Sequence, residues 1–337
     1  MLIKLDSNEN PFGPSPLALR AMQSVLEGCS AYPNDDATAL RVKLAQHHGV
    51  RVEQVLVAGG LTEFLGMLGQ EFLGPGLNAV TSQRSFMVYR LATAAAGAQL
   101  IEVPTRQNGF DLDRIAKVVN ENTGIVFLAN PNNPTGTLVT ADDVDRLLSR
   151  VSKPVVVLDE AYYEFANDFA ARRGVSYSRS LDYVREGRNV VVLRTFSKVH
   201  GLAGTRVGYG IASAELITRI ARQRPMYCVS SVAQAGAMAA LEDSEHIRRA
   251  VENNTEQSEK LFQIISAMGI AVTPAWGNFL YCEMGRDARV VAERLRLDGI
   301  LVRPLDQWGA PQAIRITIGT PKQNDALLQA MKNLKLS

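Results

Sequence analysis

The sequence has few cysteines and histidines, and it lacks long apolar runs. Its three cysteines, Cys29, Cys228 and Cys282, are widely separated and form no CxxC pair, so neither a disulfide framework nor a zinc site is indicated. The side chains of the adjacent pair His47 and His48 would diverge on a helix, and we therefore expect no metal site. The apolar runs fall well short of the ~18 residues that a membrane span needs.

An excess of either charge is also absent. The chain has 36 basic and 34 acidic residues, a net charge of +2 and no block of like charges, so binding to nucleic acid or to a membrane surface gains no support. The first residues, MLIKLDSNENPFGPSP, become polar and proline-rich too early for a signal peptide. We expect a soluble, cytoplasmic protein.

The chain has enough hydrophobic residues to form a large buried core. The chain has 337 residues, 46% of them hydrophobic, which suggests about two domains. Short apolar runs that are typical of buried strands alternate with helical patterns such as 61–71, 112–119 and 141–151. These strands are expected at Gln54–Ala58, Asn78–Thr81, Gln99–Val103, Gly124–Ala129, Pro154–Leu158 and Asn189–Leu193. The alternation predicts an α/β domain with a mostly parallel sheet covered by helices on both faces.

The last third of the sequence has a different pattern. Helical periodicity extends from about residue 214 to 268 and is interrupted at Arg224–Pro225. Short strands are then expected at Phe279–Glu283, Ile300–Val302 and Ile314–Ile318, with helices between them. This order predicts a second, smaller α+β domain. The opening segment, rich in proline and asparagine, is expected to be an extended arm.

Polar residues follow several of the predicted strands, at the edge where parallel sheets collect functional groups. They lie in four segments, with Arg206 a few residues beyond the last: Gly59–Glu63, Asn130–Gly136, Asp159–Tyr163 and Arg194–Lys198. One crevice would thus receive a glycine-rich helix start, an amide, a carboxylate, a phenol, hydroxyls, a lysine and an arginine.

Lys198 is the least expected of these residues, because an ammonium group at the end of a buried strand is costly to desolvate. Taken singly, each feature has an ordinary structural explanation. Asp159 could cap a helix, Lys198 could extend to solvent, and the glycines could only allow a tight turn. Their convergence at successive strand ends favours a binding site.

Seven motifs, in order along nearly the whole chain, carry a resemblance to a known family. They are SNENPFGP, ANPNNPTG, LDEAYYEF, RTFSKVHGLAGTRVGYG, NFLYCE, LVRP and IRITIGT. Together they resemble the pyridoxal-phosphate (PLP) aminotransferases of fold type I, and among these the histidinol-phosphate aminotransferase group. The resemblance implies a large domain with a mostly parallel seven-stranded sheet and a smaller α+β domain. It divides the chain into an arm at 1–25 that joins the small domain, a large domain at 26–255 and a small domain at 256–337.

The resemblance also implies catalytic roles. Lys198 would form a Schiff base with the cofactor and then move a proton between the substrate's Cα and the cofactor. Asp159 would keep the pyridine nitrogen protonated, so that the ring can accept electrons. Tyr162 and Asn133 would hydrogen-bond the phenolic oxygen of the ring.

The same resemblance also assigns the residues that would bind the cofactor's phosphate and cover its ring. The phosphate would be held by side chains and by backbone donors at a helix start, where the helix dipole favours an anion. These residues are Arg206, Thr195 and Ser197, with the backbone of Gly60, Leu61 and Thr62. Phe86 would stack on the ring. Tyr32, in AYPND, would reach the phosphate in a neighbouring subunit, which implies a homodimer.

The substrates implied are an amino donor and a 2-oxo acid, exchanged by a ping-pong mechanism. Histidinol phosphate or a related, possibly aromatic, amino acid would pair with 2-oxoglutarate and glutamate. Arg315 and Arg303 would bind the acidic end of the substrate, since a guanidinium binds carboxylate or phosphate through two donors. Asn278 and Asn10 are further candidates for substrate binding.

Three departures from the family pattern bear on the substrate. No Pro-Tyr stretch precedes SNENP, AGGLTE stands where GNGSDE is usual, and MYCVSS places Cys228 where the family usually has asparagine. Alternatives therefore stay open: an aromatic aminotransferase, or a decarboxylase resembling threonine-phosphate decarboxylase. A non-catalytic phosphate-binding domain is a further alternative, but it gives no reason for Lys198, Asp159 and Asn133 to occur together.

Overall fold

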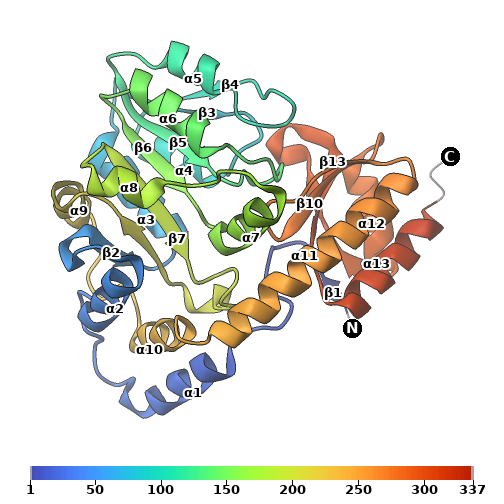
Figure 1. Cartoon of the computed structure of the whole chain (residues 1–337), viewed down its shortest axis with the longest axis horizontal. Helices are drawn as coiled ribbons and strands as arrows, with labels where there is room; N and C mark the ends of the chain where they lie inside the picture. The colour runs from blue at the N-terminus through green and yellow to red at the C-terminus, as the bar shows by residue number, and fades with distance from the viewer. Residues whose placement is uncertain (1, 335–337) are drawn as a thin grey trace.

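The computed structural model describes residues 2–334 and contains two main sheets (Figure 1). A seven-stranded sheet is built from the first two thirds of the chain, and a four-stranded sheet from the last third. The long helix α11 (Ser244–Ala267) extends from the first body toward the second. Both sheets match the α/β and α+β parts expected from the sequence.

The larger sheet is mostly parallel. Its order is β2 (Val55–Ala58), β8 (Gly208–Ile211), β7 (Val190–Thr195), β6 (Val155–Asp159), β5 (Thr123–Ala129), β3 (Asn78–Ser82) and β4 (Gln99–Val103). Only β8 runs antiparallel to its neighbours, β2 and β7. The carboxyl ends of β5, β6 and β7 therefore lie side by side at one edge of the sheet.

Both faces of this sheet are buried, which explains its continuous apolar strands. In β7, for example, Val190 and Val192 belong to one hydrophobic cluster, whereas Val191 and Leu193 belong to the cluster on the opposite face. Helices α3 (Leu61–Phe72), α4 (Val88–Ala95) and α9 (Ala214–Ala221) contribute to the second cluster. The first takes side chains from α2 (Thr38–His48), α5 (Leu112–Val118), α6 (Ala141–Arg150), α8 (Ser180–Arg185) and α10 (Ser231–Ala240).

The smaller sheet has its own core. Its order is β12 (Arg303–Leu305), β13 (Ala310–Thr317), β10 (Phe279–Glu283) and β9 (Ala271–Thr273), and every neighbouring pair is antiparallel. Its core also takes side chains from α11, α12 (Ala288–Leu297) and α13 (Pro321–Asn333). Phe169, from α7 (Tyr163–Arg173) after β6, also belongs to this cluster and so links the two bodies.

The N-terminal segment is shared between the two bodies. Strand β1 (Ile3–Lys4) pairs in parallel with β11 (Ile300–Leu301), whereas α1 (Pro16–Ser24) packs against α10 (Figure 1). The expected extended arm therefore contains a short strand and ends in a helix. The predicted boundary between residues 255 and 256 falls within α11, and the division into domains stays a prediction.

Several elements differ from the expectation. The helical pattern at 214–268 is interrupted twice, because a second break at Leu241–Asp243 separates α10 from α11. Asp243 caps α11 by accepting a hydrogen bond from the backbone of His246. The short strands β1, β9 and β12 were not expected, since two or three residues carry too little periodicity to be recognised.

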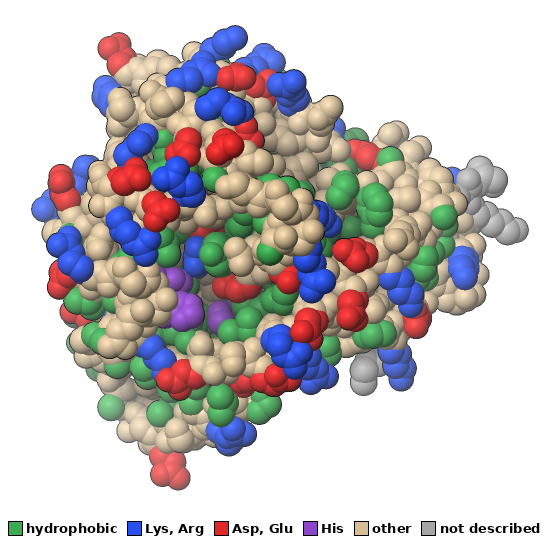
Figure 2. Space-filling view, in the orientation of Figure 1, with side chains coloured by type: hydrophobic (Ala, Val, Ile, Leu, Met, Phe, Trp, Pro, Cys, Tyr) green, Lys and Arg blue, Asp and Glu red, His purple; other side chains and the backbone are tan. Residues whose placement is uncertain are grey.

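The surface mixes the two signs of charge. Lysine and arginine side chains are interspersed with aspartate and glutamate over the face seen in Figure 2. Within residues 2–334, no helix is both long and apolar enough to cross a bilayer. In the same part of the chain, no group of three or more histidine, cysteine, aspartate or glutamate residues is arranged to bind a metal ion.

Candidate active site

A cavity of about 280 Å³ lies at the carboxyl ends of β5, β6 and β7. Most of the predicted cofactor residues line it: Leu61, Thr62, Phe86, Asn133, Asp159, Tyr162, Thr195, Ser197, Lys198 and Arg206. Ser7 and Glu9 of the N-terminal segment complete one wall. The structure therefore brings together residues up to about 200 positions apart in the chain, counted from Ser7 to Arg206.

Lys198 is half-buried in this cavity, just beyond the end of β7. Its Nζ donates to the carbonyl of Ser7 at 3.4 Å and lies 5.5 Å from the centre of the Tyr162 ring. Burial and then the nearby Arg315 charge lower the pKa of Lys198 from 10.5 to about 7. A large share of the amine is therefore uncharged near neutral pH, as a nucleophile or proton acceptor requires.

Asp159 is the last residue of β6 and is almost completely buried. Its Oδ2 accepts a hydrogen bond from the Tyr89 hydroxyl at 2.8 Å, and its Oδ1 accepts one from the backbone of Ala161 at 3.3 Å. Burial raises the pKa of Asp159 to about 6 despite these two donors. The carboxylate is held in one orientation and faces the same cavity as Lys198.

Glu160, the next residue, points away into a buried ion pair. Arg194 of β7 donates to its Oε2 from Nη2 at 2.8 Å and from Nε at 3.1 Å. Ser178 and Ser180 also donate to the Glu160 carboxylate. This pair ties the end of β6, which carries Asp159, to the strand that leads to Lys198.

Tyr162 is the centre of a buried amide network. Its hydroxyl oxygen accepts hydrogen bonds from Asn133 Nδ2 at 3.1 Å and from Asn8 Nδ2 at 2.9 Å. Asn133 Oδ1 in turn accepts from Arg315 Nη1 at 2.6 Å. Burial is the main cause that raises the pKa of Tyr162. The phenol thus stays protonated at neutral pH and can act as a hydrogen-bond donor.

The start of α3 forms an anion cradle. Gly60 is its N-cap with a φ of 89°, and no side chain caps the first turn. The Arg206 guanidinium lies against Gly60, so that an added Cβ there would stand 2.5 Å from Nη2. Thr195 Oγ1 accepts from the backbone of Ser197 at 3.1 Å and holds that loop beside the cradle. The predicted backbone donor at Gly60 is wrong for this structure, because its N–H donates to the Ala58 carbonyl at 2.7 Å. The N–H groups of Leu61 and Thr62, with the guanidinium, still favour a phosphate beside the helix start.

The predicted substrate residues lie next to this cavity. Arg315 is buried, bonds the Asp6 carbonyl at 2.7 Å besides Asn133, and leaves its Nε without a partner. Arg303 is partly exposed and donates to Asp6 Oδ2 at 3.3 Å. The two arginines are directly opposite each other in the β12–β13 ladder. A single anion could therefore contact both.

The two predicted asparagines bond to backbone in the structure. Asn278 Nδ2 donates to the carbonyl of Asn8 at 3.0 Å, and Asn10 Nδ2 donates to the carbonyl of Val199 at 2.7 Å. Neither side chain lines the cavity. Their placement indicates that they hold the N-terminal segment against the site, and direct substrate contact stays a prediction.

Tyr32 lies outside the cavity. Its side chain is 81% exposed and stacks on Tyr227, with the ring centres 4.5 Å apart. Met226, beside Tyr227, is also largely exposed. Within the single chain, Tyr32 therefore has no contact with the residues that surround Lys198.

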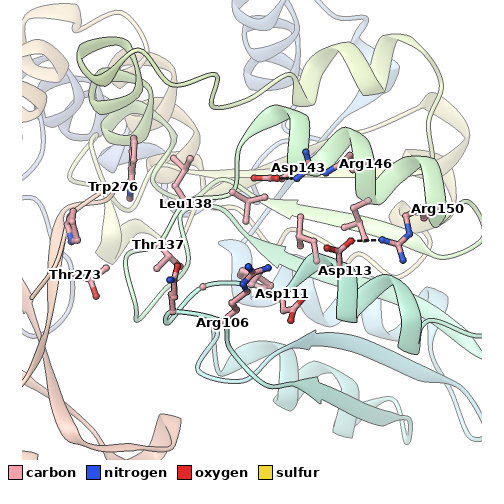
Figure 3. A pocket seen from close by; sticks show the side chains of 17 residues that line it. Arg106, Asp111, Asp113, Thr137, Leu138, Asp143, Arg146, Arg150, Thr273 and Trp276 are labelled. Carbon is pink, nitrogen blue, oxygen red and sulfur yellow. Dashed lines mark hydrogen bonds and ion pairs between the residues drawn. The ribbon is translucent and has the colours of Figure 1, made fainter.

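A second, larger cavity of about 460 Å³ contains none of the predicted site residues (Figure 3). It lies between α5, α6 and the segment after β9, and Trp276 forms part of its wall. Four of its charged side chains form ion pairs, Arg146 with Asp143 and Arg150 with Asp113. The predicted cofactor-binding residues therefore lie around the smaller cavity, not this one.

Comparison with known proteins decides the family. A model of the family "Aminotransferase class I and II" matches residues 1–331. The chain belongs to this family. The aminotransferase is 40% identical over 99% of its length to the histidinol-phosphate aminotransferase of Akkermansia muciniphila, of which it covers 90%. It is 39% identical over 99% of its length to the enzyme of the same name from Moorella thermoacetica, of which it covers 85%.

Solved structures confirm the fold of the aminotransferase. The histidinol-phosphate aminotransferase of Sinorhizobium meliloti, solved in complex with pyridoxal-5'-phosphate, matches with a TM-score of 0.89 and 27% identity. The alignment covers 99% of this chain and 92% of that one. The expectation of a PLP-dependent aminotransferase of fold type I is therefore confirmed, and a non-catalytic phosphate-binding domain is excluded.

The cavity of the aminotransferase fits PLP. At the helix start, the missing Cβ of Gly60 lets the Arg206 guanidinium lie against the backbone. Asp159 supplies a buried carboxylate, and Lys198 supplies an amine of lowered pKa in the same cavity. These groups match the phosphate, the ring nitrogen and the aldehyde of the cofactor.

Sequence reasoning missed several residues of the site, among them Ser7 and Glu9 in the cavity wall, and Tyr89 and Asn8, which bond to Asp159 and Tyr162. Asn8 lies in the recognised motif SNENPFGP, and Tyr89 lies three residues after Phe86. Asn8 precedes every strand of the large sheet, and Tyr89 lies in α4, seven residues beyond the end of β3. Neither comes directly after a strand of that sheet, which was the signal used to select candidates. Their partners, Asp159 and Tyr162, are distant in sequence, so only the fold reveals the contacts.

Proposed function

We propose that this aminotransferase transfers the amino group of histidinol phosphate to 2-oxoglutarate, forming glutamate. Relatives that are 39–40% identical over nearly the whole chain carry the name histidinol-phosphate aminotransferase, which supports this substrate. The structural observation that carries the proposal is the position of Lys198. Its amine, of lowered pKa, shares one cavity with Asp159 and an anion cradle, and lies near a buried arginine.

The cofactor would be held at three points. Lys198 would bind it covalently, and its Nζ would then accept the proton from the substrate's Cα. Asp159 would bind the protonated ring nitrogen, and Tyr162 with Asn133 would bind the phenolic oxygen. PLP, when bound, supplies a conjugated ring that accepts the electrons released at Cα.

The phosphate of the cofactor would occupy the cradle at the start of α3. The backbone N–H groups of Leu61 and Thr62 would donate to it, as the dipole of the helix favours, whereas the N–H of Gly60 donates to the Ala58 carbonyl at 2.7 Å. Arg206, with the hydroxyls of Thr195 and Ser197, completes this set. Phe86, which lines the same cavity, would cover one face of the ring.

The substrate's anion would be bound by Arg315 and Arg303. The buried Nε of Arg315 has no partner, which leaves a donor for a carboxylate or a phosphate. Both anions can occupy one site in turn, since glutamate has two carboxylates and histidinol phosphate has a phosphate. Asn278 and Asn10 would support this site by holding the N-terminal segment in place.

A homodimer would complete the cofactor site. Tyr32 is exposed on the single chain and stacks on a second exposed aromatic residue, Tyr227. By resemblance to the family, Tyr32 would donate a hydrogen bond to the cofactor's phosphate in a second copy. Sedimentation at assay concentration tests this, with a fully active monomer as the contradicting outcome. The cytoplasmic location stays a prediction.

A screen of amino donors tests the substrate. Histidinol phosphate, phenylalanine and tyrosine are compared with 2-oxoglutarate as acceptor, and kcat/KM is measured for each. The proposal expects the highest value for histidinol phosphate. A higher value for phenylalanine would favour an aromatic aminotransferase, and release of carbon dioxide without a 2-oxo product would indicate a decarboxylase.

Variants of the two arginines then locate the anion site. Arg315→Ala is expected to reduce kcat/KM for glutamate at least about 30-fold, because losing one partner of a desolvated charge pair costs ~2–5 kcal/mol. If Arg303 reads the phosphate, Arg303→Ala reduces kcat/KM for histidinol phosphate much more than for phenylalanine. Equal losses for both donors would assign Arg303 a structural role.

A further inference from the structure

The hydroxyl of Tyr162 receives two amide donors and has no protein acceptor. Asn8 Nδ2 lies 2.9 Å and Asn133 Nδ2 lies 3.1 Å from its oxygen. Within residues 2–334, no carbonyl or carboxylate accepts the Tyr162 proton. Because both amides donate, the phenol must direct its own proton elsewhere, and Tyr162 lines the cavity.

The orientation of each amide is fixed by its oxygen. Asn133 Oδ1 accepts from Arg315 Nη1 at 2.6 Å, and arginine can only donate. Thr317 accepts a hydrogen bond at its hydroxyl oxygen from the backbone of Asn8 at 2.8 Å, and its hydroxyl donates to Asn8 Oδ1 at 3.2 Å. Neither amide can therefore be turned over without losing a bond. Two residues of β13, Arg315 and Thr317, thus orient the amides.

Asn8 is also held firmly in place. Its side chain is buried, its backbone φ is 55°, and its carbonyl accepts a bond from Asn278 Nδ2 at 3.0 Å. Asparagine adopts this left-handed conformation more readily than most residues. The position therefore suits a residue that combines this backbone with an amide donor.

We propose that Asn8 is a positioning residue, which, oriented by Thr317, directs the proton of Tyr162 into the cavity and onto the phenolic oxygen of the cofactor. This inference rests on the proposed function, which assigns that oxygen to Tyr162. Asn8 acts only through Tyr162 and contacts neither the ring nor the substrate. Through this chain of hydrogen bonds, Asn8 in the N-terminal segment and Thr317 in the small sheet would influence the charge on the cofactor's phenolic oxygen.

The effect can be read from the protonation of the nitrogen that joins Lys198 to the cofactor. A proton donated to the ring oxygen withdraws negative charge from it, which lowers the proton affinity of that neighbouring nitrogen. The charged groups around Tyr162 are Arg315 from β13, Asp159 from β6 and Lys198 after β7. The variants described next leave all three unchanged.

The experiment is a pH titration of the cofactor's visible absorption in the purified holoenzyme. Asn8→Gly suits the left-handed backbone and removes the amide, whereas Asn8→Asp replaces the donor by an acceptor. We expect Asn8→Asp to raise the pH midpoint by about one unit and Asn8→Gly to raise it by less, since only the former draws the Tyr162 proton away. Thr317→Val is also expected to raise the midpoint, and Thr317→Ser, which keeps the hydroxyl, to retain the wild-type value.

A double-mutant cycle separates this role from a general loosening of the N-terminal segment. In a Tyr162→Phe background, Asn8→Gly is expected to cause no further shift, because the hydroxyl through which it acts is gone. Midpoints of Asn8→Asp and Thr317→Val equal to that of the wild type would overturn the inference. An equal shift with and without the Tyr162 hydroxyl would also overturn it. Wild-type protein that binds no PLP would instead overturn the proposed function, and this inference with it.

Discussion

The guanidinium of Arg206 occupies the space that a side chain at residue 60 would need. A Cβ on Gly60 would stand 2.5 Å from Arg206 Nη2, and the φ of 89° disfavours any other residue. The positive φ and the neighbouring guanidinium therefore both favour glycine where the start of α3 meets Arg206. Because Gly60 has no side chain, the guanidinium of Arg206 can lie directly against the start of α3.

Substitution of this glycine tests the cradle. Gly60→Ala is expected to displace Arg206 and to raise the Kd for PLP at least about tenfold, since a charge-assisted contact of ~1.5 kcal/mol or more is lost. Gly66→Ala, in the same helix with no atom within 4 Å of the added Cβ, is the matched control. It should leave the Kd unchanged. Equal Kd values for both variants would show that the cofactor's phosphate lies elsewhere.

Asp159 is predicted to act through its charge. Asp159→Asn keeps the shape but removes the negative charge that holds the proton of the ring nitrogen, so kcat should fall at least about 10²-fold, as on losing a major electrostatic stabiliser. Asp111→Asn is the control, because Asp111 caps α5 outside this cavity and asparagine caps equally well. A near-normal kcat for Asp159→Asn would reduce Asp159 to a structural role.

The lowered pKa of Lys198 predicts a pH effect on the cofactor-free protein. The folded pKa of about 7 lies below the ordinary value of 10.5, so between these values the unfolded chain holds a proton that the folded chain has released. The contribution of this group to stability therefore rises with pH across that window. Compared with Lys198→Met, the wild type should gain free energy of unfolding from pH 7 to pH 10. A constant difference would contradict the lowered pKa.

The buried pair of Arg194 and Glu160 predicts a large effect on stability. Arg194→Met leaves a buried carboxylate without its cation, which typically costs ~3–5 kcal/mol. Arg248→Met is the control, since Arg248 pairs with Glu245 and Glu252 on the surface, where such pairs contribute ~1 kcal/mol or less. Urea denaturation of both cofactor-free variants measures the difference. Similar losses would mean that the interior pair is not a main link between β6 and β7.

The parts of the site that the sequence predicted share a simple origin. Lys198, Asp159 and Asn133 each follow an apolar run, and neighbouring parallel strands bring such positions to one edge. The motifs recognised around them then assigned roles that strand order alone cannot. The large sheet was predictable for the same reason, because strands buried on both faces are continuously apolar.

The parts that escaped prediction depend on contacts across the whole chain. Asn8 bonds to Tyr162 and Thr317, which are 154 and 309 residues away. Tyr89 reaches Asp159, at the end of β6, from helix α4, 70 residues earlier in the chain. The strands β1, β9 and β12 are only two or three residues long, and their pairing with longer neighbours, not their own pattern, makes them strands.

The central claim, that Lys198 binds the cofactor, is tested most directly by reduction with borohydride. Holoenzyme is reduced, digested, and its peptides are analysed by mass spectrometry for the pyridoxyl group. The account predicts that this group is found on Lys198, and that the Lys198→Ala protein carries no covalent cofactor although its phosphate cradle is intact. A pyridoxyl group on another lysine, or on none, would contradict the account.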